Sequence, residues 1–460
     1  MLAHGLWTFA RFAYLTARSP WSRDYGEGCV LAAGQLLAQR GSYFPDLAGY
    51  PYFVANYPPL FVAAVAAGQR AFGPSLWFPR LLALAATLAL VSVLYRVLRG
   101  LLGERPAALA GAALFTMPWF VSTWAALARV DTAAIALSLA GLGIALERGV
   151  SRRAWPALVC FWLAFFTKQN ALLAPAAVLL ELGLARDRRF ARAALAYVLP
   201  LVALFGLLVA ATGGAAWRHL VPYTAAADYE PERMAGAYLQ FALISAPLLL
   251  LIGLALATVP RAFGRGAGRV LLLYFGLNAA ALAAIAKAGA AQNYFLEPWL
   301  ATLLLSAFSL RALSERFPVL WSWRFALLLA AAAIAHFAYP SLARLPQALR
   351  APQNAEEFFA LTRLVRETPG DLVSENLSLL VVNRRPVLVE PFGVLLLAKH
   401  GLLDTAPLVA DCERGRFALV VSEHRLWQVP GLGDCLERRY EPLADLGPYQ
   451  ALRPKPLSSR

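Results

Sequence analysis

Long apolar stretches alternate with short polar segments over the first three quarters of the chain. A helix needs roughly 20 mostly apolar residues to cross the hydrocarbon core of a bilayer, and about eleven stretches approach that length. They are residues 2–17, 79–98, 106–121, 131–146, 155–167, 171–185, 193–212, 238–259, 270–286, 294–310 and 325–339. The pattern predicts an all-α polytopic membrane protein whose transmembrane part covers residues 1–342.

The segments between these stretches alternate in arginine content, which predicts an orientation. Lys and Arg are retained on the cytoplasmic side of a membrane. The arginine-rich loops carry Arg96, Arg99 and Arg105; Arg148, Arg152 and Arg153; Arg186, Arg188, Arg189 and Arg192; Arg261, Arg265 and Arg269; and Arg311, Arg316 and Arg324. We therefore expect these loops and the N-terminus to be cytoplasmic and everything after Tyr339 to be extracytoplasmic.

One apolar segment does not fit this alternation. Residues 59–72 are too short to cross, and a crossing there would invert the side of every later loop. We interpret this segment as a helix lying on the outer membrane surface or dipping into it. Residues 19–78 then form one large external loop with juxtamembrane helices, and its many aromatic side chains suit the membrane interface.

The composition changes near residue 343. Charged residues become frequent, and residues 371–375, 386–390 and 417–422 have the pattern of short buried strands, accompanied by a helix at 355–367. We predict a small external α/β domain over residues 343–460. Cys412 and Cys435 both fall within it, and a disulfide between them is compatible with an oxidising compartment.

The overall composition agrees with a membrane protein. Of 460 residues, 60% are hydrophobic and only 15% charged, and the mean hydropathy is +0.57, whereas soluble domains are about half apolar and a quarter charged. The net charge of +15 would suggest a nucleic-acid partner in a soluble domain. Here the basic residues lie between apolar spans, so we expect the bilayer as partner and no nucleic acid.

Two acids in the expected first external loop are candidates for chemistry. Asp24 and Glu27 are three residues apart, which places both carboxylates on one face of a helix. One interpretation is that they form the N-cap and first-turn acid of the next helix. The other is that one of them acts as a general base toward a hydroxyl, or that both ligate a divalent cation such as Mg²⁺ or Mn²⁺.

Other polar residues also collect on the expected outer side. They are Tyr57, Arg129, Asp131, Lys168, Gln169, Asn293, Tyr294 and Glu297. Asp131 could simply begin a helix, and Arg129 and Lys168 could simply extend to the interface. Glu297 lies about one turn inside an expected span, where an ionisable group is a functional candidate, although an ion pair with Lys287 or Lys168 is a structural alternative.

These motifs, in this order, resemble the integral-membrane glycosyltransferases of the GT-C fold. The resemblance is to glycosyltransferase family 39-like proteins, which include protein O-mannosyltransferases and the aminoarabinose transferase that modifies lipid A. The residues that carry it are Asp24-Tyr25-Gly26-Glu27-Gly28, Asn56-Tyr57-Pro58-Pro59-Leu60, Arg129-Val130-Asp131, Phe166-Thr167-Lys168-Gln169 and Asn293-Tyr294-Phe295-Leu296-Glu297.

The resemblance implies a membrane enzyme that takes a sugar from a polyprenyl-phosphate carrier and passes it to an external lipid, glycan or protein. The first-loop acid of such enzymes is the catalytic base, which implies this role for Asp24 with Glu27 as its partner. Arg129 and Lys168 would stabilise the departing phosphate. The expected location is the plasma (inner) membrane. Two alternatives are a flippase for the lipid-linked sugar and a non-enzymatic assembly factor.

Overall fold

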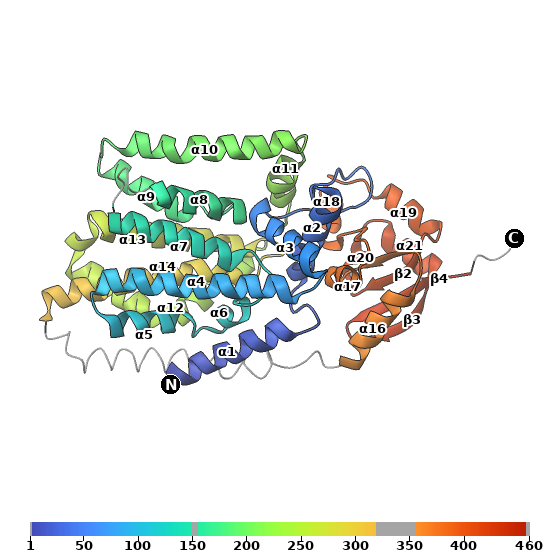
Figure 1. Ribbon diagram of the computed structural model, residues 1–460, viewed down its shortest axis with the longest axis horizontal. Helices are drawn as coiled ribbons and strands as arrows, with labels where there is room; N and C mark the ends of the chain where they lie inside the picture. The colour runs from blue at the N-terminus through green and yellow to red at the C-terminus, as the bar shows by residue number, and fades with distance from the viewer. Residues whose placement is uncertain (1, 149–154, 319–354, 457–460) are drawn as a thin grey trace.

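The first part of the chain forms a bundle of long apolar helices. The computed structural model describes residues 2–148, 155–318 and 355–456. Five of the described helices are long and apolar enough to cross a membrane. They are α4 (Trp77–Leu102), α10 (Phe190–Ala211), α12 (Pro231–Thr258), α13 (Gly266–Ala281) with the turn η4 (Leu282–Ala286), and α14 (Leu296–Arg316) preceded by the turn η5 (Gln292–Phe295). They run along the long axis of the molecule (Figure 1).

Shorter helices complete the bundle and account for most of the other expected spans. They are α1 (Leu2–Arg18), α5 (Arg105–Phe115), α6 (Trp119–Trp124), α7 (Asp131–Arg148), α8 (Trp155–Thr167) and α9 (Leu173–Leu184). The expectation of one helix over 106–121 is wrong, because Pro118 cannot continue the helix and the chain breaks between α5 and α6. The expected span 325–339 lies outside the described residues.

Burial separates a central helix from a peripheral one. In α14 the side chains of Trp299, Leu300 and Leu304 are fully buried, whereas in α10 Leu199 and Leu207 are 60% and 66% exposed. Figure 1 shows α10 on the outer edge of the bundle. Large exposed leucines along a long apolar helix are unfavourable in water and favourable in lipid. The protein is therefore a mostly helical membrane protein.

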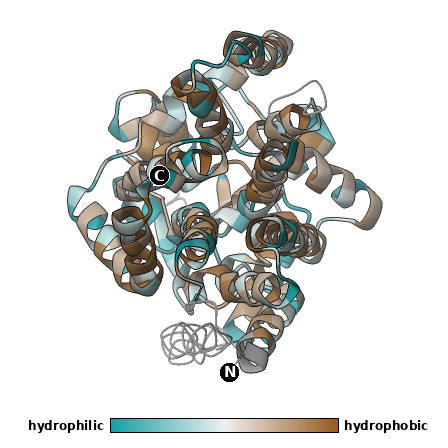
Figure 2. Cartoon of the chain, turned by 90° about the vertical axis from the view of Figure 1, so that its left-hand side faces the viewer, coloured by the Kyte–Doolittle hydropathy of each residue, from teal (hydrophilic) through white to brown (hydrophobic). Residues whose placement is uncertain are grey.

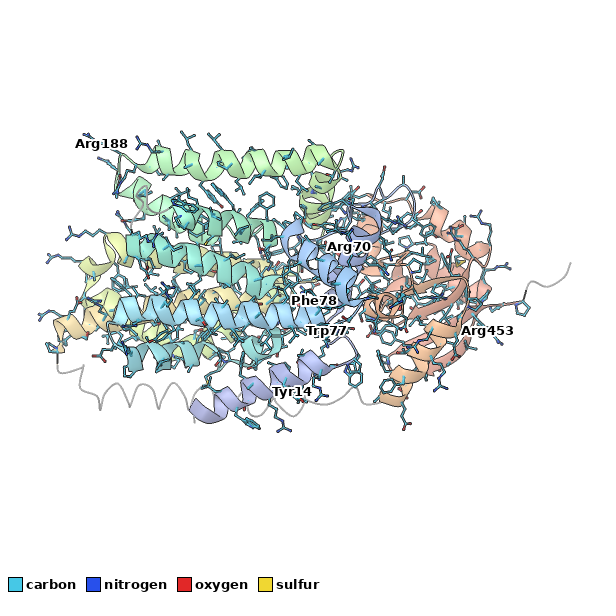
Figure 3. The ribbon with its side chains drawn as sticks, viewed as in Figure 1. Tyr14, Arg70, Trp77, Phe78, Arg188 and Arg453 are labelled. Carbon is cyan, nitrogen blue, oxygen red and sulfur yellow. A yellow bond between two sulfur atoms is a disulfide. The ribbon has the colours of Figure 1, made fainter. Side chains whose placement is uncertain are left out.

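The described parts of the arginine-rich loops gather at one end of the bundle (Figure 1). Figure 3 places Arg188 at this end and Trp77, the first residue of α4, toward the opposite end. The loops contact one another there, since Arg311 donates a hydrogen bond to the Leu101 carbonyl at 2.9 Å and Arg269 pairs with Glu181. Figure 2 views this end, where hydrophilic segments connect the hydrophobic helices.

The segment between α1 and α4 lies at the other end of the bundle. It contains α2 (Tyr25–Arg40) and α3 (Pro59–Phe72), which pack against each other between the bundle and the C-terminal region (Figure 1). Residues 59–72 are a helix, as expected. The π-helical turn η2 (His219–Tyr223), which follows the short helix α11 (Ala215–Arg218), holds the same segment, because His219 hydrogen-bonds the Ala55 amide and the Pro45 carbonyl.

The C-terminal region is a mixed four-stranded sheet with helices. Its strands are β1 (Asp371–Ser374), β2 (Phe417–Ser422), β3 (Tyr440–Leu446) and β4 (Tyr449–Pro454). The order is β1-β2-β4-β3, with β1 and β2 parallel and the other pairs antiparallel. The helices are α16 (Ala355–Glu367), α17 (Leu377–Val382), α18 (Pro391–Lys399), α19 (Ala406–Glu413), α20 (Arg425–Gln428) and α21 (Leu432–Arg439).

Two of the three expected strands are confirmed, at 371–374 and 417–422. The third, at 386–390, is wrong as a strand of the sheet, because its backbone pairs with the segment before α3 instead. Tyr52 donates to the Leu388 carbonyl at 2.8 Å and Glu390 donates to the Tyr52 carbonyl at 2.7 Å. A disulfide joins Cys412 in α19 to Cys435 in α21, as considered from the sequence.

Candidate active site

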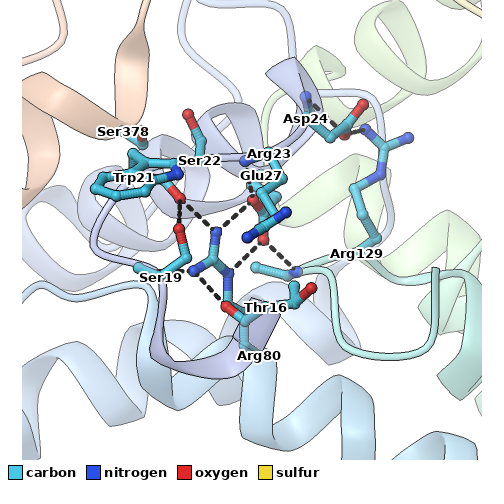
Figure 4. Close-up of polar contacts among 12 residues, drawn as sticks. Thr16, Ser19, Trp21, Ser22, Arg23, Asp24, Glu27, Arg80, Arg129 and Ser378 are labelled. Atoms are coloured by element: carbon cyan, nitrogen blue, oxygen red, sulfur yellow. Dashed lines mark hydrogen bonds and ion pairs between the residues drawn. The ribbon is translucent and has the colours of Figure 1, made fainter. Parts of the chain in front are cut away.

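Asp24 caps α2 and faces a basic side chain. Its Oδ1 accepts a hydrogen bond from the Gly26 amide at 3.0 Å, the usual role of an N-cap aspartate, and a second one from Arg129 Nη1 at 2.8 Å (Figure 4). The side chain is 24% exposed, and Oδ2 has no hydrogen-bond partner among the described residues. Asp24 can therefore cap α2 and at the same time belong to a polar site.

A glycine makes this ion pair possible. A Cβ atom at position 26 would lie 1.3 Å from Arg129 Nη1, so any other residue there would displace the guanidinium from Asp24. Glycine therefore serves here to allow the close approach of a side chain to the helix backbone.

A chain of polar contacts continues from Arg129 into the bundle. Its Nη2 donates to the Tyr57 hydroxyl at 2.9 Å, and its Nε lies 3.6 Å from Asp131 Oδ2. Asp131 Oδ1 accepts hydrogen bonds from Lys168 Nζ at 2.7 Å and from Asn293 Nδ2 at 2.8 Å. Asp131 is only 1% exposed. Its carboxylate pairs with Lys168 and Arg129, so its role is not limited to the start of a helix.

Four separate segments supply these side chains. Tyr57 comes from the segment before α3, Arg129 and Asp131 from the junction between the preceding loop and α7, Lys168 from the turn after α8, and Asn293 from η5. All of these segments lie at the end of the bundle away from the arginine-rich loops. The expected gathering of polar residues at one end is therefore present in the fold.

A cavity of about 300 Å³ opens beside this chain of contacts. Its polar lining includes Arg129, Lys168, Gln169, Asn293 and Lys287. Its apolar lining includes Val54, Phe392, Leu396 and Leu397, three of them from α18 of the C-terminal region. The cavity is thus lined both by fixed cations and by apolar side chains of the C-terminal region.

The charges of the basic groups follow from their surroundings. Burial lowers the pKa of Lys168, but the Asp131 carboxylate, acting together with Tyr294 and Tyr57, holds this pKa above its usual value. Burial lowers the pKa of Lys287, whose ammonium contacts the Thr224 carbonyl. Burial also raises the pKa of Tyr57 to about 12. Lys168 is therefore a permanent cation at neutral pH, beside a protonated phenol.

Glu27 has a different environment from Asp24. It is fully buried, and Arg80, also fully buried, binds both of its oxygens at 2.8 Å. The backbone amides of Arg23 and Ala128 occupy its remaining acceptor positions. Glu27 therefore does not line the cavity, and its carboxylate does not meet that of Asp24 (Figure 4).

Of the remaining expected residues, Gln169 and Tyr294 line the cavity and Glu297 does not. Gln169 donates to the Asn56 carbonyl at 3.0 Å and lines the cavity. Tyr294 also lines it, with its ring 5.2 Å from Lys168 Nζ. Glu297 lies deeper and accepts a hydrogen bond from Tyr274 at 3.0 Å. Within the described residues it forms no ion pair with Lys168 or Lys287.

Sequence reasoning missed two contributors to this region, and it named a third, Lys287, only as a possible partner of Glu297. Arg80 is the partner of Glu27, and its place near the start of an expected span was a usable signal, because ionisable groups in spans are functional candidates. Lys287 adds a third cation to the cavity. The apolar wall from α18 had no sequence signal, since it depends on how the C-terminal region packs on the bundle.

The carboxylates at the start of α2 do not form a metal cluster. Among the described residues, the group of three whose ligand atoms lie within 4.8 Å of one another is Glu375, Glu423 and His424, in the C-terminal region. At Glu27 every acceptor position is used by protein donors. A divalent cation at Asp24 and Glu27 together therefore does not fit the hydrogen bonds of Glu27.

Comparison with known proteins gives a family match for part of the chain and a fold match for nearly all of it. Residues 56–212 match the family model of dolichyl-phosphate-mannose-protein mannosyltransferases. The fold matches the crystal structure of ArnT from Cupriavidus metallidurans in the apo state, with a TM-score of 0.63 and 15% identity over 98% of this chain and 96% of ArnT. The chain has the ArnT fold.

The same protein bound to undecaprenyl phosphate matches with a TM-score of 0.61 and 14% identity, over the same shares of the two chains. No curated protein gives a significant sequence match to this chain. The resemblance inferred from the motifs is confirmed by these matches, to the mannosyltransferase family model over residues 56–212 and to the fold of ArnT over nearly the whole chain.

Proposed function

We propose that this protein transfers a sugar from a polyprenyl-phosphate donor to an acceptor on the extracytoplasmic face of the membrane. The observation that carries this proposal is the continuous set of contacts from Asp24 through Arg129 and Asp131 to Lys168 beside one cavity. It supplies a partly exposed carboxylate next to fixed cations, which are the groups that phosphate-linked glycosyl transfer requires.

The proposed sidedness rests on the two ends of the bundle. Because Lys and Arg are retained on the cytoplasmic side, the end with the arginine-rich loops would be cytoplasmic, and the cavity and the region from about residue 343 onward would face outward. The arrangement predicted from the sequence, about eleven spans with the N-terminus inside, would have this orientation. It would place the cavity at the outer leaflet of the plasma (inner) membrane.

Arg129 and Lys168 would bind the donor phosphate. Both line the cavity and each is paired with Asp131, which holds it in place before any substrate arrives. Preorganised cations stabilise negative charge that develops as a bond breaks. The ArnT crystal structure with undecaprenyl phosphate supports a polyprenyl phosphate as the lipid.

Asp24 would act as the general base. Its Oδ2 would take the proton from the acceptor hydroxyl as the hydroxyl oxygen attacks the anomeric carbon. The bond from that carbon to the phosphate oxygen breaks with its electron pair, and polyprenyl phosphate leaves. A single direct displacement inverts the anomeric configuration. Asp24 is better suited than Glu27, whose oxygens are buried and fully bonded.

The test is Asp24→Asn with a donor labelled in the sugar. Asn keeps a side-chain oxygen for the Gly26 amide but cannot take the proton, so transfer should fall about 100-fold or more while polyprenyl-phosphate binding persists. The matched control is Asp46→Asn in the same loop, which should transfer normally. Full transfer by Asp24→Asn would remove Asp24 from the mechanism. Wild-type protein that only moves intact donor between leaflets would instead identify a lipid-linked sugar carrier.

A further inference from the structure

Glu27 lies one helical turn after Asp24 but makes a closed set of contacts. Its Oε1 accepts hydrogen bonds from Arg80 Nε and from the Ala128 amide, each at 2.8 Å. Its Oε2 accepts from Arg80 Nη2 and from the Arg23 amide, each also at 2.8 Å. Four donors therefore surround a carboxylate that has no exposed surface (Figure 4).

Arg80, near the start of α4, is equally closed. Besides Glu27, its guanidinium donates to the backbone carbonyls of Thr16 at 2.8 Å, Ser19 at 2.6 Å and Trp21 at 2.8 Å. All five N–H donors of the guanidinium thus have acceptors. A buried ion pair is tolerated when the remaining donors and acceptors are satisfied in this way, and here it joins α1, α2, α4 and the loop before α7.

The two backbone amides that donate to Glu27 belong to residues next to the proposed site. Arg23 is the residue immediately before Asp24, and Ala128 is the residue immediately before Arg129. One carboxylate therefore fixes the backbone on both sides of the Asp24–Arg129 ion pair, although these two residues are 105 positions apart in the chain. A displacement of Glu27 would displace both members of that pair.

We propose that Glu27 and Arg80 are positioning residues that set the geometry between Asp24 and Arg129 without contacting substrate. This inference rests on the proposed function, because the geometry they set is that of the proposed base and the proposed phosphate ligand. Small displacements of reacting groups cost large factors in rate, so the pair governs turnover more than donor affinity, since Asp131 still holds Lys168.

The test compares Glu27→Gln with the wild-type protein. Gln keeps one acceptor oxygen but presents an amide N–H₂ toward a backbone N–H or the Arg80 guanidinium, so the two backbone segments separate. We expect kcat per folded molecule to fall about 100-fold and KM for the lipid donor to change less than about threefold. Glu181→Gln is the matched control, because Glu181 joins Arg269 and the Gly266 amide at the opposite end of the bundle.

A purely structural role gives a different result. It predicts that both variants lose thermal stability and that both keep wild-type kcat per folded molecule, which would overturn the inference. If Glu27→Gln does not accumulate, Arg80→Lys is measured in the same way. It keeps the buried charge balanced but cannot reproduce the bidentate contact and the three carbonyl contacts.

A density map of the same variant separates this inference from the proposed function. We expect the Asp24–Arg129 ion pair to be broken in Glu27→Gln and intact in Glu181→Gln, whether or not the wild-type protein transfers sugar. An intact Asp24–Arg129 pair in the map of Glu27→Gln would overturn the positioning role. Absence of transfer by the wild-type protein would overturn only the proposed function.

Discussion

The two ends of the helix bundle both carry arginines but use them in different ways. At the end away from the C-terminal region, Arg188 is exposed and Arg311 forms an exposed ion pair with Glu315 on its own helix. At the other end, Arg80 is fully buried and Arg129 is 12% exposed, and each binds a carboxylate from a distant segment.

This difference shows what distinguishes an orientation signal from a site. Exposed arginines influence membrane orientation through their number in a loop, and they need no partner of defined geometry. Buried arginines must have partners, because an unpaired charge away from water is unfavourable by several kcal/mol. Each buried arginine here therefore fixes the position of a carboxylate, and a set of such pairs forms a rigid charged wall.

The largest expected difference between substitutions at the two ends of the bundle is in stability. Asp131→Leu leaves Lys168 without its carboxylate in a mostly buried position, and we expect a loss of about 3 kcal/mol or more. Glu315→Ala removes the exposed partner of Arg311 and should change stability little. Thermal unfolding in detergent measures both. Equal losses in the two variants would contradict the distinction between the two ends.

The next effect is on activity. Lys168→Met removes a cation from the cavity, and we expect sugar transfer to fall about 100-fold. Arg188→Met removes a cation at the opposite end and should leave the rate unchanged. Initial rates with labelled donor, normalised to folded protein, measure the difference. A comparable fall in both variants would mean that overall charge, not the cavity, controls the rate.

The smallest effect concerns pH. Burial lowers the pKa of His219 to about 4 from 6.5, and its neutral ring accepts a hydrogen bond from the Ala55 amide. The unfolded chain takes up this proton at higher pH than the folded protein, so stability is complete above about pH 6.5 and declines as pH falls toward 4. We expect about 2 kcal/mol less stability at pH 5.

Thermal unfolding at pH 7 and pH 5 checks this dependence on acid. His219→Asn should flatten it, whereas the exposed His424→Asn should retain it. The same acid loss in His219→Asn as in the wild-type protein would assign the effect to other groups.

Several elements were predictable from local sequence because local physics decides them. The apolar stretches of α4, α7, α8 and α10 can satisfy their backbone only as helices in lipid, and their residues needed no tertiary information. The break between α5 and α6 was not predicted, although Pro118 lies in the sequence there. The continuous apolar residues on both sides of this proline suggested a single span. The hairpin of β3 and β4 was also missed, because its strands are only partly buried.

The sequence by itself determined that this chain is a helical membrane protein, with arginines separated from a set of polar motifs, because hydropathy and loop charge act residue by residue. Only the tertiary structure decided the roles of Asp24 and Glu27. The two acids share one helical turn and equal chemistry, but Asp24 is partly exposed and pairs with Arg129, whereas Glu27 is buried and pairs with a buried arginine. Burial and partners distant in the chain made that difference. Neither can be inferred from the spacing of the two acids in the sequence.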